Sequence, residues 1–115
     1  QGGVSLLAPD QEPSKKSGVW AEFFGVPAWS SKLVHQMLQE NPTGKTLLVY
    51  VRRLEEGFEL GFEEFNSDIY NEDAAISATA MNCGFEKCIA LYTAQYQWDY
   101  KRFKRNPEKF YRKKK

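Results

Sequence analysis

The sequence predicts an α/β fold, in which a partial mixed sheet is flanked by two helices. Two short, almost continuous apolar runs, residues 4–8 and 46–51, are typical of strands that are buried on both faces. Residues 58–63 alternate between apolar and other side chains, which indicates a half-exposed antiparallel strand. Residues 32–40 and 73–92 repeat apolar side chains at helical spacing, and these stretches predict the two helices.

The first apolar run ends in turn-forming residues, with proline, aspartate and serine over residues 9–14. Asp10 and Gln11 therefore lie just beyond the C-terminal end of the predicted strand, which is the edge where open α/β sheets bind ligands. Residues 19–29 follow and carry four large aromatic rings. They predict a hairpin or loop whose rings are partly core and partly an apolar surface.

The first helix begins after a serine N-cap, either Ser30 or Ser31, and ends at an Asn-Pro-Thr-Gly sequence. The strand over residues 46–51 is the clearest in the chain. It ends in Arg52 and Arg53, so two cations are expected at the end of this strand.

Two pairs of side chains are candidate ligand contacts. Asp10 and Gln11 can hydrogen-bond a sugar hydroxyl or orient a base, but an ordinary Asx turn explains them equally well. Arg52 and Arg53 can hold a phosphate through bidentate donors, or they can pair with the acidic residues that follow them. If both strands belong to one sheet, an arginine should converge with Asp10 and Gln11.

The single histidine offers a further candidate. His35 and Glu40 are separated by four residues, a spacing that some acyltransferases use to orient an imidazole base. Five residues along a helix turn through about 500°, so the two side chains point about 140° apart. A histidine on the helix surface, or one that is partly packed, is the expected outcome.

The formal net charge of +1 conceals a strong asymmetry. Residues 54–73 contain eight acidic and no basic residues, whereas residues 99–115 contain nine basic and two acidic ones. The acidic middle is expected to face water, and the basic end is expected to meet an anionic partner. Aromatic and basic residues also alternate closely over residues 95–107. This segment requires either one partner that is both anionic and apolar, or a core for its rings together with an anionic surface for its cations.

Cys83 and Cys88 are five residues apart, so they lie on different faces of the predicted helix and are expected to be free thiols in a reducing compartment. The sequence has no metal-ligand spacing, glycine-rich phosphate loop or nucleophile elbow. No apolar run approaches the roughly 20 residues that span a bilayer. The chain begins with Gln1 instead of Met, and a predicted strand follows almost at once, so a fragment of a longer protein is expected.

Three blocks in order point to a family. They read Gly-Gly-Val through Ala-Pro-Asp-Gln-Glu-Pro (residues 2–13), Phe-Phe-Gly-Val-Pro-Ala (residues 23–28), and Gln-Tyr-Gln-Trp followed by Arg-Phe-Lys and Pro (residues 95–107). With these blocks and the apolar strand ending in arginine between them, the sequence resembles the lipid A biosynthesis acyltransferases. These form the lauroyl/myristoyl branch of the lysophospholipid acyltransferase superfamily.

Two departures from the family's usual pattern leave the acceptor open: Thr93-Ala94 stand in place of Pro-Glu, and Tyr100 stands in place of a histidine. A glycerolipid acyltransferase would instead show a Pro-Glu-Gly-x-Arg phosphate block where Pro9-Asp10-Gln11 stands. That block is absent from the sequence.

The resemblance implies the C-terminal portion of a lysophospholipid-acyltransferase-like fold. Residues 1–107 would be the C-terminal part of an acyltransferase domain, and residues 108–115 a basic tail. The implied reaction moves a fatty acyl chain from acyl carrier protein to a hydroxyl of a Kdo-lipid A precursor. It would take place at the cytoplasmic face of the Gram-negative inner membrane, without a cofactor beyond the acyl donor.

The family's His-x4-Asp/Glu motif lies upstream of its Pro-Asp-Gln block. The resemblance therefore implies no catalytic residue in this fragment, which would be inactive alone. The implied partners are acyl carrier protein, the lipid A precursor and the membrane surface, with no nucleic acid or metal. Residues 95–98 would close the core, and cations from Lys101 onward would face a membrane or an acidic partner. The expected substrate-binding residues are Asp10, Gln11, Arg52, Arg53, Arg102 and Lys104.

An alternative hypothesis is that the chain is not an enzyme fragment but a non-catalytic binding module with an aromatic and basic surface. In that case Tyr96, Trp98, Tyr100 and Phe103 would stack on the bases of a single-stranded nucleic acid while the neighbouring cations hold its phosphates. The same residues would also suit an anionic membrane surface. A steep salt dependence of nucleic-acid affinity would distinguish this module from an acyltransferase.

Overall fold

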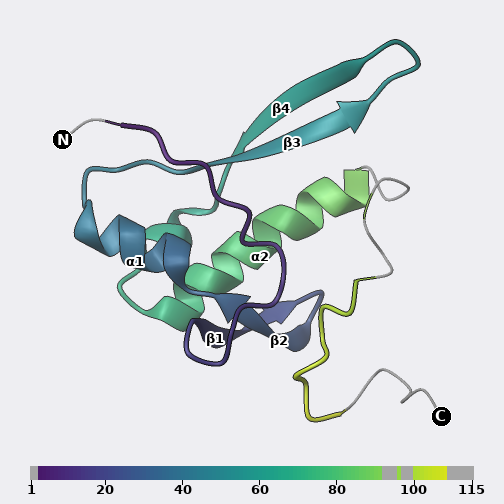
Figure 1. Ribbon diagram of the computed structural model, residues 1–115. Helices are drawn as coiled ribbons and strands as arrows, with labels where there is room; N and C mark the ends of the chain where they lie inside the picture. Colours follow the sequence, from purple (N-terminus) through teal and green to yellow (C-terminus); the bar gives the residue numbers. More distant parts are fainter. Residues whose placement is uncertain (1–2, 92–95, 97–99, 109–115) are drawn as a thin grey trace.

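The computed structural model describes residues 3–91, 96 and 100–108, and it confirms the α/β class (Figure 1). Two β-hairpins, two α-helices and one 3-10 helix make up the described chain. In order they are β1 (Gly18–Phe23), β2 (Val26–Ser31), α1 (Leu33–Glu40), β3 (Leu47–Arg53), β4 (Phe58–Glu64), η1 (Ser67–Tyr70) and α2 (Ala74–Leu91). The predicted helices, the aromatic hairpin and the strands at residues 46–51 and 58–63 are all present, with ends shifted by one or two residues.

The predicted strand over residues 4–8 is wrong. These residues have no secondary structure, and Val4 and Leu6 are almost fully exposed, at 101% and 87%. A strand forms only when a neighbour pairs with its backbone, and within the described residues none does. The strands that do form make two separate two-stranded antiparallel sheets, β1–β2 and β3–β4, instead of one mixed sheet.

The β1–β2 hairpin lies against α2 and determines the position of the polar site described below (Figure 1). Antiparallel pairing places Ala21 opposite Ala28, and both side chains are buried with Phe23 on the inner face. Trp20 and Trp29 are paired on the outer face, where their rings meet edge to face at 5.1 Å. Of the four rings in this segment, only Phe23 is fully buried, so the division between core and surface rings is confirmed.

The β1–β2 turn consists of Phe24 and Gly25, both with positive φ, at 51° and 75°. Tight hairpin turns favour this backbone, but a large side chain such as Phe24 adopts it at a cost. The carboxylate of Glu86, on α2, accepts a hydrogen bond from the Phe24 N–H. This contact ties the turn to the helix and offsets part of that cost.

The β3–β4 hairpin has two unlike faces. Leu48 is buried, and the Tyr50 ring lies over Gly61, where an added Cβ would be 2.1 Å from the ring. The opposite face, which we term the apolar face, carries six large apolar side chains that are 40–70% exposed. They are Leu47, Val49, Val51, Phe58, Leu60 and Phe62. The acidic residues between 54 and 73 are all exposed, as predicted.

The predicted serine N-cap of α1 is wrong, because the N-cap residue is Lys32 and its side chain makes no capping hydrogen bond. Ser31 Oγ accepts the N–H of Leu33 at the start of α1, and the Asp73 carboxylate accepts the N–H groups of Ala75 and Ile76 at the start of α2. A small core of Ile69, Ala80 and Met81 lies between η1 and α2, with Val34, Leu38, Phe65 and Phe85 packed against it. No helix in the described ranges is long and apolar enough to cross a membrane.

Candidate functional site

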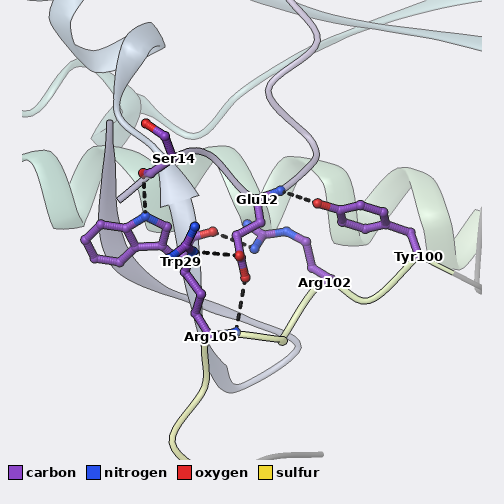
Figure 2. Close-up of polar contacts among 6 residues, drawn as sticks. All are labelled: Glu12, Ser14, Trp29, Tyr100, Arg102 and Arg105. Carbon is purple, nitrogen blue, oxygen red and sulfur yellow. Dashed lines mark hydrogen bonds and ion pairs between the residues drawn. The ribbon is translucent and has the colours of Figure 1, made fainter. Parts of the chain in front are cut away.

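The loop of residues 9–13, which we term the Pro-Asp-Gln loop, lies against the C-terminal segment of residues 100–108 (Figure 2). The Glu12 N–H donates to the Tyr100 hydroxyl oxygen at 2.8 Å. Glu12 Oε2 accepts the backbone N–H of Arg105 at 3.2 Å, and Glu12 Oε1 lies 2.7 Å from Arg105 Nε. This last contact is a close ion pair, although its angle is poor for a hydrogen bond. Two segments far apart in sequence are thus joined at a single glutamate.

Arg102 anchors the same segment to β2 from within the protein. Only 3% of this residue is exposed, and its guanidinium donates to the Trp29 carbonyl at 2.7 Å and to Ser30 Oγ at 2.9 Å. Asn82 of α2 donates to the same Ser30 Oγ at 2.9 Å, so strand, helix and segment meet at one hydroxyl. Four residues further on, Asn106 Nδ2 donates to the Pro27 carbonyl at 2.7 Å.

The prediction that cations from Lys101 onward face outward is therefore wrong for Arg102. A guanidinium has five donors in a planar fork, which can satisfy strand carbonyls that a lysine ammonium would not match. Lys101 and Lys104 are exposed, as predicted. Gln95, Gln97 and Trp98 lie outside the described residues, so the predicted closing role of residues 95–98 stays a prediction.

Burial lowers the pKa of Arg102, and the nearby Tyr100, Tyr96, Glu12 and Asp10 raise it. The ordinary pKa of arginine is so high that the guanidinium stays charged at neutral pH. A fixed positive charge therefore lies behind the Pro-Asp-Gln loop.

The arginines that lie near this loop are not Arg52 and Arg53, the two that were predicted to converge with it. Arg52 and Arg53 are exposed at the end of β3, next to the turn of the β3–β4 hairpin (Figure 1). Arg52 forms an exposed ion pair with Glu59 across the hairpin, at 3.8 Å. The predicted convergence required both strands to share one sheet, which they do not. Arg102 and Arg105 lie near the loop instead.

Glu12 and Arg105 were not among the predicted site residues. The sequence does hold a signal for Glu12, which stands next to a proline in a turn and close to Asp10. Nothing in residue spacing pairs it with Arg105, because that contact joins residues 93 positions apart.

Asp10 and Gln11 are exposed, and Asp10 lies at the edge of an apolar cavity of about 680 Å³. The cavity lies between residues 3–10, β3 and α2. Its apolar and aromatic walls include Leu48, Met81, Phe85, Cys88, Ile89 and Tyr96. Lys104 is exposed and is not among the residues that line the cavity.

Burial raises the pKa of the Cys88 thiol above its ordinary value of 9.0, and the negative charge of Glu63 raises it further. The neutral thiol is therefore favoured in the folded chain. The resulting contribution to stability is present below pH 9 and is lost as the pH rises through the folded pKa. We expect the midpoint of the pH profile for alkylation of Cys88 by iodoacetamide to lie above that of the same cysteine in urea. Coinciding midpoints would contradict this expectation.

His35 is half-buried on α1, and its Nδ1 is buried without a hydrogen-bond partner in the described part of the chain. Glu40 is exposed at the end of the same helix. Both cysteines are free thiols, as predicted. Over residues 3–91, 96 and 100–108, no group of three or more His, Cys, Asp and Glu side chains is placed to hold a metal ion.

An apolar cavity with a carboxylate loop at its edge suits an enzyme that handles a lipid chain, and the ordered sequence blocks point to an acyltransferase. The comparison with known families makes this specific. The model of the bacterial lipid A biosynthesis acyltransferase family matches residues 1–105, and the chain belongs to that family. A lipid A biosynthesis lauroyltransferase of Escherichia coli (strain K12) is 31% identical over 111 residues. That match covers 94% of this chain and 36% of the relative, so the chain spans about a third of the relative's length.

Proposed function

We propose that these residues form the C-terminal part of an acyltransferase that moves a fatty acyl chain from acyl carrier protein to a hydroxyl of a Kdo-lipid A precursor. The observation that carries the proposal is the apolar cavity beside Asp10 in a chain of this family. The lauroyltransferase activity in the name of the E. coli relative supports it. The reaction would take place at the cytoplasmic face of the inner membrane.

In this proposal the acyl chain enters the cavity between residues 3–10, β3 and α2. Each methylene moved from water into such a cavity contributes about 0.8 kcal/mol to binding. Asp10 and Gln11, at its edge, would orient the hydroxyl or the base that activates it. Arg52, Arg53 and Lys104 are exposed and would meet lipid phosphates or the acidic carrier protein. Arg102 would act through the segment that it anchors.

The reaction itself exchanges one ester for another. The acceptor hydroxyl attacks the thioester carbonyl, a C–O bond forms, and the C–S bond breaks as the carrier thiol takes up the proton. We place the catalytic histidine and carboxylate outside these 115 residues. The family's His-x4-Asp/Glu motif lies upstream of the Pro-Asp-Gln block, whereas His35, the only histidine of the chain, lies downstream of it. The 115-residue chain alone would then be inactive.

The test compares the complete protein encoded by the gene with the 115-residue chain. Each is incubated with acyl carrier protein bearing a labelled acyl chain and with a Kdo-lipid A precursor. We expect label transfer by the complete protein and none by the 115-residue chain. Asp10→Asn in the complete protein should lower kcat/KM about a hundredfold if Asp10 orients a reacting group. Transfer by the short chain, or none by the complete protein, would overturn the proposal.

The nucleic-acid alternative is disfavoured by two internal contacts. The Phe103 ring lies 5.9 Å from the ring of Phe23, and the buried guanidinium of Arg102 lies 5.5 Å from the same ring. Because these two side chains pack inside the protein, they are not accessible to the bases and phosphates of a nucleic acid. Nucleic-acid affinity that falls steeply with salt would nevertheless favour the alternative.

The cavity makes a prediction about acyl chain length. Cys88→Phe in the complete protein should fill part of the cavity and shift the preference toward shorter acyl chains. Each lost methylene contact is worth about fourfold in kcat/KM. Cys83→Phe is the matched control, because Cys83 is another half-exposed cysteine of α2 that lines a different, shallower hollow. Equal preferences in the two variants would show that the acyl chain binds elsewhere.

A further inference from the structure

We propose that Glu12, Tyr100 and Arg105 form a latch that positions the Pro-Asp-Gln loop. In the complete protein these three would be positioning residues for Asp10 and Gln11. The role in acyl transfer rests on the proposed function, whereas the latch itself rests only on the contacts shown in Figure 2.

The first argument is the burial of the Glu12 carboxylate, whose side chain is 1% exposed. A buried carboxylate is costly unless it is paired and hydrogen-bonded. Arg105 supplies both kinds of contact, through Nε at 2.7 Å from Oε1 and through its backbone N–H at 3.2 Å from Oε2. The carboxylate and the arginine therefore stabilise each other at this one place.

The second argument concerns the hydrogen bonds and ion pairs that hold the loop in the part of the chain that the structure describes. Within the described residues, every hydrogen bond and ion pair made by residues 9–13 runs through Glu12. Asp10 and Gln11 are exposed and make no hydrogen bond there. Residues 3–8, before the loop, are exposed and pair with none of the described strands. The orientation of Asp10 and Gln11 therefore depends on the neighbouring Glu12.

The third argument is that the C-terminal side of the latch is itself anchored. Arg102 is bonded to β2 through the Trp29 carbonyl and Ser30 Oγ, and Asn106 is bonded to β2 through Nδ2. Tyr100 and Arg105 thus extend from a segment tied to the hairpin, and they present fixed partners to Glu12. The position of β2 is in this way transmitted to the loop.

The first arm of the test measures hydrogen exchange of single backbone amides in the complete protein, by mass spectrometry with residue-resolving fragmentation. Tyr100→Phe removes the acceptor of the Glu12 amide, and Arg105→Ala removes the ion pair of the Glu12 carboxylate, so each should speed exchange of the Glu12 amide by about tenfold. Glu12→Gln should speed exchange of the Arg105 amide, so that each segment loosens the other. Unchanged exchange at both amides would overturn the latch.

Two further variants keep this arm specific. Arg105→Lys retains the charge and should restore part of the protection that Arg105→Ala removes. Glu22→Gln is the matched control, because Glu22 is an exposed glutamate on β1 and lies outside the latch. A change as large in Glu22→Gln as in Glu12→Gln would show a general loosening of the fold and would contradict a local latch.

The second arm measures acyl transfer by the same proteins. Glu12→Gln should lower kcat about tenfold with little change in KM for the carrier-bound donor, because misplaced orienting groups affect the reacting geometry more than binding. If exchange increases while kcat is unchanged, the latch is structural and the positioning role is wrong. If the unaltered protein transfers no acyl chain, the proposed function fails, and the exchange data alone decide the latch.

Discussion

Arg102→Met is expected to lower the free energy of unfolding by about 3 kcal/mol, because it removes a buried charge with two good acceptors. Methionine keeps much of the side-chain volume, so the effect comes from the lost hydrogen bonds more than from a cavity. The Trp29 carbonyl loses its donor from Arg102, whereas Ser30 Oγ keeps the donor from Asn82. The C-terminal segment also loses its main tie to β2.

Urea denaturation at one protein concentration measures this effect as a lower midpoint. Lys104→Met is the matched control, since Lys104 lies two residues away in the same segment and is exposed. It should change stability by less than about 0.5 kcal/mol. Arg102→Lys should fall between the two, because lysine keeps the charge but not the two-pronged geometry. Equal midpoints for Arg102→Met and Lys104→Met would show that the buried contacts contribute nothing.

The second large effect concerns the apolar face of the β3–β4 hairpin. The 115-residue chain is expected to self-associate through this face at micromolar concentrations. Six large apolar side chains share it by register and are 40–70% exposed, and soluble monomers rarely leave such a contiguous surface open to water. Covering it contributes about 25 cal/mol for each Å² of apolar surface removed from water. Sedimentation velocity should show a mass that grows with concentration.

A paired substitution on β4 tests whether this face is responsible. Leu60→Gln combined with Phe62→Gln places two polar groups in the middle of the face and should shift the chain toward monomer. Ile76→Gln is the control, since Ile76 is an apolar residue on α2 that is 43% exposed and lies outside this face. A clean monomer from the unaltered chain, with cooperative thermal unfolding, would rule out the expected self-association.

Much of the fold could be predicted because it depends on neighbours in the sequence. Apolar spacing identifies α1 and α2, the alternation after Gly57 identifies β4, and each of these patterns acts within a few turns of chain. The strand over residues 4–8 was mispredicted for the opposite reason. Its apolar run has the right composition, but a strand exists only when distant backbone pairs with it.

In the candidate site, too, some features could be predicted from neighbouring residues and others depend on distant contacts. Three blocks in order were enough to predict the family, and the local turn chemistry was enough to place Asp10 and Gln11 in a turn after an apolar run. The burial of Arg102 and the pairing of Glu12 with Arg105, 93 positions away, become visible only in the folded chain. The reason is physical, because whether a charged side chain faces water or an internal partner depends on which groups folding brings within about 3 Å of it, and residue spacing does not encode that distance.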